Sequence, residues 1–234
     1  CIMPDIMADS DGFLVSCDIE ASFFPPGKPA VILFEPNRNV PGASYVLIDD
    51  HHAGSIITKY LIRIGHGRIC FVGNVRRYSW ARDRYRGMCD AMAEASLPKP
   101  VLVEIEREQS VGGQIVKKVS TDRVTAVVCA NDAIAMGAIS SFHKEGIKVP
   151  EDISVAGFDD VPSAAFFEPA LTTVKLPAQE AIEVALQEIE KRIVSERREP
   201  PRKILLPTEL IVRNSCVPPR SRSGFAKQEQ HGIP

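Results

Sequence analysis

Two short apolar runs, each leading into a pair of polar residues, constrain the fold of this chain more than any other feature. Residues 124–129 (VTAVVC) lead to Asn131-Asp132, and residues 153–158 (ISVAGF) lead to Asp159-Asp160. Between them, apolar residues recur at helical spacing until Gly146, and glycine commonly follows the end of a helix. Two strands joined by a helix form a parallel βαβ unit, and such sheets bind ligands at the carboxyl ends of their strands. Both polar pairs are therefore predicted to face one cleft.

The rest of the chain alternates between strand and helix patterns, which predicts an α/β fold. We expect further strands at residues 12–16, 30–34, 44–48, 68–72, 101–105, 203–206 and 209–213. Amphipathic helices are expected over about 51–64, 80–95 and 178–195, because apolar residues there share one face. Beyond residue 217 the composition turns to Pro, Ser, Arg and Gln, so residues 218–234 are predicted to be a disordered tail.

The composition argues against several classes of protein. With 234 residues, of which 44% are apolar and 25% charged, the chain can bury a sizeable core. Its net charge of −2 provides no overall basic field for nucleic acid. No apolar run reaches the roughly 18 residues that a membrane span needs, and the N-terminus lacks the charged-then-apolar order of a signal peptide. We therefore expect a cytoplasmic protein without membrane contact.

The six cysteines form no CxxC pair and no close cluster with histidine, so neither metal binding nor disulfide pairing is indicated. Cys70, Cys89 and Cys129 lie on apolar strand or helix faces, which favours small buried side chains in a reducing compartment. The adjacent His51 and His52 stand at a helix start and point in different directions, so we expect a cap and a surface residue there. No metal or cofactor site is predicted.

Three long segments carry a family resemblance. VVCANDAIAMGAI, GIKVPEDISVAGFDD and PALTTVKLP resemble the signature segments of the lactose-repressor and galactose-repressor (LacI/GalR) family of bacterial transcription regulators. The resemblance extends over about residues 11–215 and concerns the effector-binding core. It implies a two-lobed, type I periplasmic-binding-protein-like fold with parallel sheets flanked by helices, and a small molecule between the lobes, usually a sugar or nucleoside-type ligand. It also implies a homodimer that contacts operator DNA only through a helix-turn-helix headpiece, and nothing in this sequence resembles that headpiece.

The resemblance further implies three ligand-binding residues. They are Arg84 in the segment RYRG, Asn131 in the segment AND, and Asp159, the first Asp of GFDD. Sugar hydroxyls both donate and accept hydrogen bonds, so a guanidinium, an amide and a carboxylate can hold neighbouring hydroxyls. From the residues alone, Arg84 is typical of a solvated helix face, and either Asn131 or Asp132 could be a helix N-cap. Of the last two, we expect Asp132 to be the cap.

The family topology also predicts how the chain divides into lobes. One lobe would comprise residues 1–66 and 176–199, and the other residues 67–174 and 203–217. The chain would cross between them near residues 65–67, 172–176 and 199–203, as short connectors for lobe closure. The family has two βα units before its counterpart of the strand at 12–16, and almost all of that is absent here. The N-terminal lobe is therefore expected to be incomplete.

Other observations leave alternatives open. The family places a stacking aromatic residue in a loop whose equivalent here, residues 106–111 (EREQSV), has none; Trp80, Phe158 or Phe166 is the alternative source. A periplasmic sugar-binding protein of a transport system shares the fold, but its precursor would carry a signal peptide and usually few free cysteines. For a nucleotide-dependent enzyme, Gly65-His66-Gly67 stands after a helix and before a strand, the reverse of the dinucleotide-binding order. No pattern of catalytic residues appears, so no enzyme activity is predicted.

Overall fold

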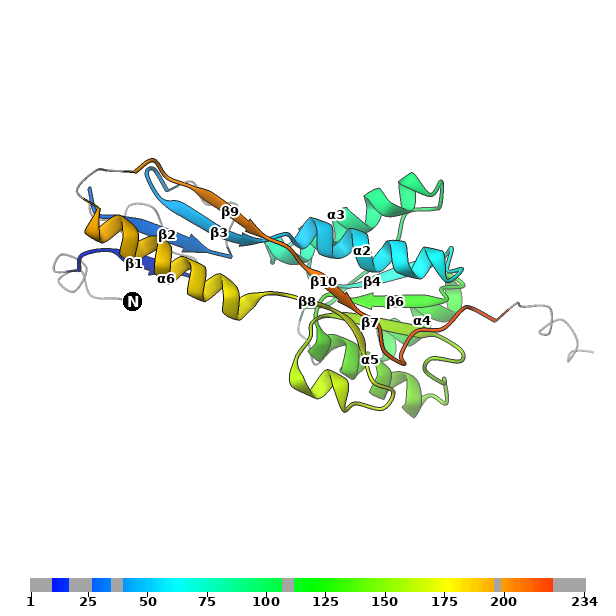
Figure 1. Ribbon diagram of the computed structural model, residues 1–234. Coiled ribbons are helices and arrows are strands. Elements are labelled where there is room, and N and C mark those ends of the chain that lie inside the picture. Colours follow the sequence, from blue (N-terminus) through cyan, green and yellow to red (C-terminus); the bar gives the residue numbers. More distant parts are fainter. Residues whose placement is uncertain (1–9, 17–26, 35–39, 107–111, 196–198, 221–234) are drawn as a thin grey trace, which may run out of the picture.

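The structure is a computed structural model, and it describes residues 10–16, 27–34, 40–106, 112–195 and 199–220. It consists of a smaller and a larger α/β part that lie next to each other (Figure 1). The smaller part has a four-stranded sheet in the order β1-β2-β3-β9, in which all neighbours are parallel. Its strands are β1 (Phe13–Val15), β2 (Ala30–Leu33), β3 (Ser44–Ile48) and β9 (Lys203–Leu206).

The larger part has a six-stranded sheet in the order β10-β8-β7-β6-β4-β5. Its strands are β4 (Ile69–Gly73), β5 (Val101–Glu104), β6 (Ala126–Cys129), β7 (Ser154–Asp159), β8 (Thr172–Lys175) and β10 (Glu209–Ile211). Neighbours are parallel except for β10, which is antiparallel to β8. The predicted βαβ unit is confirmed, because β6 and β7 are parallel neighbours joined by α5 (Asp132–Lys144).

Helices cover both faces of the larger sheet and one face of the smaller sheet (Figure 1). On the larger sheet, α2 (Asp50–Arg63) and α3 (Ser79–Glu94) lie over one face, and α4 (Gly112–Thr121) and α5 lie over the other. Helix α6 (Ala178–Val194) covers the smaller sheet, and a short 3-10 helix, η3 (Pro162–Ala165), follows β7. The predicted α/β fold with parallel sheets flanked by helices is therefore confirmed.

The two parts have separate apolar cores. In the smaller part, Ala181 and Ala185 of α6 pack against Val31 and Val46. The larger core contains residues from strands and helices alike, and Phe71 is fully buried in it. Full burial of one such side chain contributes about 1.5–3 kcal/mol, so each part has its own source of stability.

Two segments belong to a different sheet from the one that the family topology predicts. Helix α2, expected in the first lobe, packs its Ile57 and Leu61 into the core of the larger part. Strand β9, expected in the second lobe, pairs with β3 of the smaller sheet. An amphipathic pattern shows which helix face is buried, but it does not show which sheet buries it.

As a result, the chain passes between the sheets at Asp49, at residues 176–177 and at residues 207–208. Of the three expected crossings, only the one near residues 172–176 lies close to an observed one. Residues 221–234 of the expected disordered tail lie outside the described residues. None of the helices among the described residues combines the length and hydrophobicity of a membrane span.

Candidate functional site

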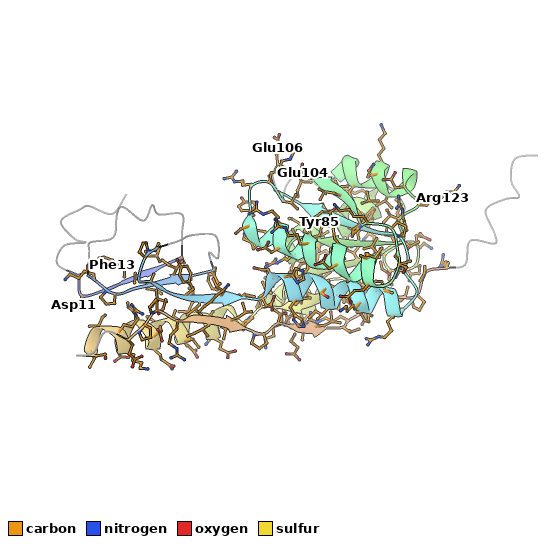
Figure 2. The ribbon with its side chains drawn as sticks, turned by 90° about the horizontal axis from the view of Figure 1, so that it is seen from above. Asp11, Phe13, Tyr85, Glu104, Glu106 and Arg123 are labelled. Atoms are coloured by element: carbon orange, nitrogen blue, oxygen red, sulfur yellow. The ribbon has the colours of Figure 1, made fainter. Side chains whose placement is uncertain are left out.

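A cavity of about 350 Å³ lies between the two sheets. It is lined by Ser16, Phe34, Ile48, Asp50, Trp80, Arg84, Asn131, Asp159, Leu176 and Ala178. These residues come from the carboxyl ends of strands in both sheets and from the first two turns of helices. In Figure 2, Glu104 at the carboxyl end of β5 lies on the side turned toward the smaller part, whereas Arg123, which precedes β6, lies at the opposite end. The parallel strands thus present their carboxyl ends to the cavity, as the sequence predicts.

Asn131, rather than Asp132, is the N-cap of α5. The Asn131 Oδ1 accepts a hydrogen bond from the Ile134 N–H at 2.8 Å, and the same residue lines the cavity. The expectation that Asp132 caps the helix is therefore wrong. An N-cap lies where the chain leaves the strand and enters the helix, so this role holds Asn131 at the carboxyl end of β6.

Asp132 instead connects the helix start to two neighbouring segments. Its fully buried carboxylate accepts hydrogen bonds from the Thr173 hydroxyl at 2.6 Å and from the Val161 N–H at 3.0 Å. Burial raises the pKa of Asp132, and these hydrogen bonds oppose the rise. Gly157 leaves room for this carboxylate, since a Cβ there would lie 2.3 Å from the Asp132 Oδ1. Asp132 therefore anchors the loop that follows β7.

Asp159 and Asp160 occupy an unusual backbone conformation at the end of β7. Their φ angles are 111° and 56°, a region that residues other than glycine rarely adopt. Such strain persists only where surrounding contacts hold it, and it is common at ligand sites. Here Arg213 forms an ion pair with Asp160, with 2.6 Å between Nη2 and Oδ1, and the Asp132 carboxylate accepts a hydrogen bond from the Val161 N–H. Asp159 lines the cavity, whereas Asp160 forms its ion pair with Arg213.

Arg84 connects three segments around the cavity. Its Nε donates to the Asp50 Oδ1 at 2.8 Å, and its Nη1 donates to the Ala130 carbonyl oxygen at 2.6 Å. The same Nη1 lies 3.8 Å from the Asp159 Oδ1. The guanidinium carbon lies 4.7 Å from the ring centroids of both Trp80 and Phe158. Arg84 is buried, so the interpretation of a solvated helix face is wrong.

Two glycines allow α2 and α3 to approach closely enough for this contact. A Cβ at Gly54 would lie 1.9 Å from the Arg84 carbonyl oxygen, and a Cβ at Gly87 would lie 1.9 Å from the His51 carbonyl oxygen. Both obstacles are backbone atoms, which cannot turn away as side chains do. The glycines therefore place the start of α2, with Asp50, against Arg84.

Asp50 is a charged cavity residue that was not predicted from the sequence. It follows the N-cap Asp49, whose Oδ1 accepts from the His52 N–H at 2.8 Å. Burial raises the pKa of Asp50 above its ordinary value, and the charge and hydrogen bond of Arg84 oppose this rise. The Asp49-Asp50 pair stands after an apolar strand pattern, as Asp159-Asp160 does, and that repetition was the available signal.

The aromatic residues and the histidines lie in distinct places. Trp80 lines the cavity, whereas Phe158 is buried behind Arg84 and Phe166 is 89% exposed and absent from the cavity lining.

His51 contacts Asp90 and His52 contacts Thr208, so the two rings do not converge. Within the described ranges, no three His, Cys, Asp or Glu side chains are grouped so as to hold a metal ion.

Comparison with known proteins identifies the fold and its relatives. Residues 58–216 match the periplasmic binding protein-like domain. The chain is 35% identical over 225 residues to the HTH-type transcriptional repressor PurR of Haemophilus influenzae, which covers 88% of this chain and 64% of that protein. A LacI family transcriptional regulator from Enterococcus faecium, with bound ribose, superposes with a TM-score of 0.81 at 22% identity, over 94% of this chain and 85% of the other. The complex of the transcriptional regulator CelR with cellobiose has a TM-score of 0.78 at 25% identity, over 91% of this chain and 68% of the other.

The two sheets and the cavity between them define a periplasmic binding protein-like domain. The chain belongs to the LacI/GalR family of transcription regulators, and it corresponds to the effector-binding core of that family. It spans about two thirds of the length of PurR from H. influenzae. The family predicted from the three signature segments is confirmed.

Proposed function

We propose that this chain is the effector-sensing core of a sugar-responsive transcription regulator, and that the effector binds in the cavity between the two sheets through Arg84, Asn131 and Asp159. The main support is that all three predicted residues line one cavity, although they lie far apart in the sequence. The volume of about 350 Å³ falls at the lower end of the range for small-molecule sites, which favours a compact ligand. The CelR–cellobiose complex supports a sugar as the class of effector.

The chemistry of the cavity also supports a polyol. Asp159 supplies acceptors, and Asn131 lies beside it at the start of α5. Trp80 also lines the cavity, where its ring lies against the Arg84 guanidinium and stacks on Tyr78. Arg84 also fixes the positions of Asp50 and the carboxyl end of β6, because two of its N–H groups bond to them.

We further propose that the two parts act as lobes that close on the effector. Of the described residues, the smaller lobe would comprise those within 10–49 and 178–206, and the larger lobe those within 50–175 and 209–217. In the full-length protein, a homodimer in the cytoplasm, closure would change the affinity for operator DNA through a headpiece outside this chain. A periplasmic sugar-binding protein of a transport system is the second candidate, but the similarity to PurR does not favour it.

A thermal-shift screen against sugars, sugar phosphates and nucleobases tests the proposal. A ligand that binds only the folded state raises its apparent stability, so at least one sugar should raise the Tm in a concentration-dependent way. Asp159→Asn should reduce this shift, whereas Asp160→Asn should retain it because Asp160 does not line the cavity. If the folded protein shows no shift with any sugar, the proposed function is wrong.

A further inference from the structure

The cavity is lined by more acidic than basic side chains. Among the described residues that line it, Asp50 and Asp159 are acidic and Arg84 is the only basic one. Two carboxylates and one guanidinium leave an excess of one negative charge at neutral pH. An excess charge in a partly enclosed site acts on a charged ligand more strongly than the same charge does in water.

The two carboxylates are also more exposed to a ligand than the guanidinium is, which increases the excess of negative charge that the ligand meets. The Arg84 side chain is 5% exposed, whereas the side chains of Asp50 and Asp159 are 15% and 38% exposed. Two N–H groups of Arg84 point at Asp50 and at the Ala130 carbonyl oxygen, and its faces are covered by Trp80 and Phe158. A phosphate is usually held by the open edge of a guanidinium, which offers two parallel donors. An entering ligand here meets the carboxylates more readily than it meets the guanidinium.

Helix N-termini act in the opposite direction, since their partial positive charge favours anions. Helices α2 and α5 both begin at the cavity, but each already has a side-chain cap, from Asp49 and Asn131 respectively. Helices α3 and α6 have no side-chain cap, and Trp80 and Ala178 in their first turns line the cavity. Their backbone N–H groups can bind neutral hydroxyl oxygens as well as anions. The partial charge at a helix end is only about half a unit and acts within the first turn, whereas the Asp50 and Asp159 carboxylates carry full charges on the cavity wall.

We infer that the cavity selects sugars without an anionic group, either neutral or ammonium-bearing, and that Asp50 is a residue that sets this selectivity. The inference rests on the proposed function and specifies its ligand class. Asp50 repels a phosphate or carboxylate on the ligand, and it also occupies the guanidinium that would otherwise bind such a group. Replacement of Asp50 by a neutral residue of the same shape should therefore change the preference in favour of anions.

Isothermal titration calorimetry on the whole chain tests this with D-glucose, D-glucosamine and D-ribose, and with the terminal phosphate esters of glucose and ribose. For the unaltered chain, each phosphate ester should bind at least about tenfold more weakly than its parent sugar. The measured quantity is the Kd of each phosphate ester divided by the Kd of its parent sugar. In Asp50→Asn, this ratio of Kd values should fall by about tenfold or more, and the affinity for glucosamine relative to glucose should decrease. Asp49→Asn is the matched control, because it removes the same charge one residue away and retains a good N-cap. Its ratio should stay within about threefold of the unaltered chain.

Asp159→Asn provides a second variant, in case Asp50→Asn does not fold, because Asp159 is more exposed and its replacement disturbs the fold less. It should lower the same ratio. A phosphate ester that binds the unaltered chain as tightly as its parent sugar overturns the inference, and so does an unchanged ratio in the folded variants. Binding of the esters alone would overturn it while leaving a small-molecule effector in place. Failure of every probe to bind would contradict the proposed sugar function itself and the inference with it.

Discussion

Replacement of Arg84 by alanine should destabilise the fold itself as well as the ligand site. The change removes the contacts at 2.8 Å to Asp50 and at 2.6 Å to the Ala130 carbonyl oxygen, together with the packing between two aromatic rings. Loss of one partner of a buried ion pair costs about 3–5 kcal/mol, because the other charge remains buried. Since the Asp50 side chain retains 15% exposure, we expect a loss of about 3 kcal/mol in the free energy of unfolding at neutral pH.

The loss should depend on pH in a definite direction. Burial raises the pKa of Asp50 and Arg84 opposes the rise, so the pKa of Asp50 should rise further in Arg84→Ala. A carboxyl group whose pKa is higher in the folded than in the unfolded state lowers stability above that folded pKa. This cost disappears as the pH falls below the unfolded value of 3.8. The destabilisation by Arg84→Ala should therefore shrink as the pH falls from neutrality toward the ordinary pKa of Asp.

Urea unfolding measures both effects. Fluorescence of Trp80, the single tryptophan of the chain, reports on the cavity, and far-ultraviolet circular dichroism provides an independent signal. The double variant Arg84→Ala with Asp50→Asn should recover about 1 kcal/mol or more of the free energy of unfolding, because it also removes the charge of the Asp50 carboxylate that has lost its partner. Arg86→Ala is the control: its side chain is 64% exposed, and its loss should stay within about 0.5 kcal/mol. A loss below about 1 kcal/mol for Arg84→Ala, or one that is independent of pH, would refute the reasoning.

Three further predictions concern other residues. Asp159→Asn should weaken effector binding by about 1.5–3 kcal/mol, the value of a charged hydrogen bond, and Asp160→Asn should weaken it less; equal affinities in calorimetry would contradict this order. Gly87→Ala should lower the free energy of unfolding by about 3 kcal/mol, since its Cβ would meet the His51 carbonyl oxygen at 1.9 Å, and an unchanged urea midpoint would disprove this close contact. Burial lowers the pKa of His66, so the fold should lose stability as the pH falls through the unfolded value of 6.5, and His66→Gln should flatten the pH profile of the urea midpoint there.

The elements of the fold could be predicted from the sequence because their signals are local. Alternating or continuous apolar runs mark the strands, and the spacing of residues such as Ile57 and Leu61 marks a helix. The order of two strands around α5 was predictable as well, because a parallel connection needs a crossover helix. By contrast, the sheet that buries α2 depends on contacts between distant segments, and no local pattern in one sequence specifies them.

From the residues alone, the site was predictable only as polar residue types at strand ends, whereas Arg84 was predicted from the family resemblance. Arg84, Asn131 and Asp159 do line one cavity, but no local pattern indicates that Arg84 is buried against two aromatic rings. The role of Asp50 depends on the approach of α2 to α3, which depends in turn on the absence of a side chain at Gly54. A glycine in a helix has many possible reasons, so its partner could be identified only from the structure.

The connectors between the two parts lie at the cavity itself, and this gives effector binding a direct influence on their arrangement. Ile48 and Asp50 flank the first passage of the chain between the sheets, and Leu176 and Ala178 lie at the second. A shift of a two-state equilibrium from 1:99 to 99:1 requires about 5.5 kcal/mol of differential binding. Charge-assisted hydrogen bonds contribute about 1.5–3 kcal/mol each, so about two to four of them, formed only in the closed arrangement, suffice. We therefore expect that losing the Asp159 contact alone removes a large part of the response while leaving binding measurable.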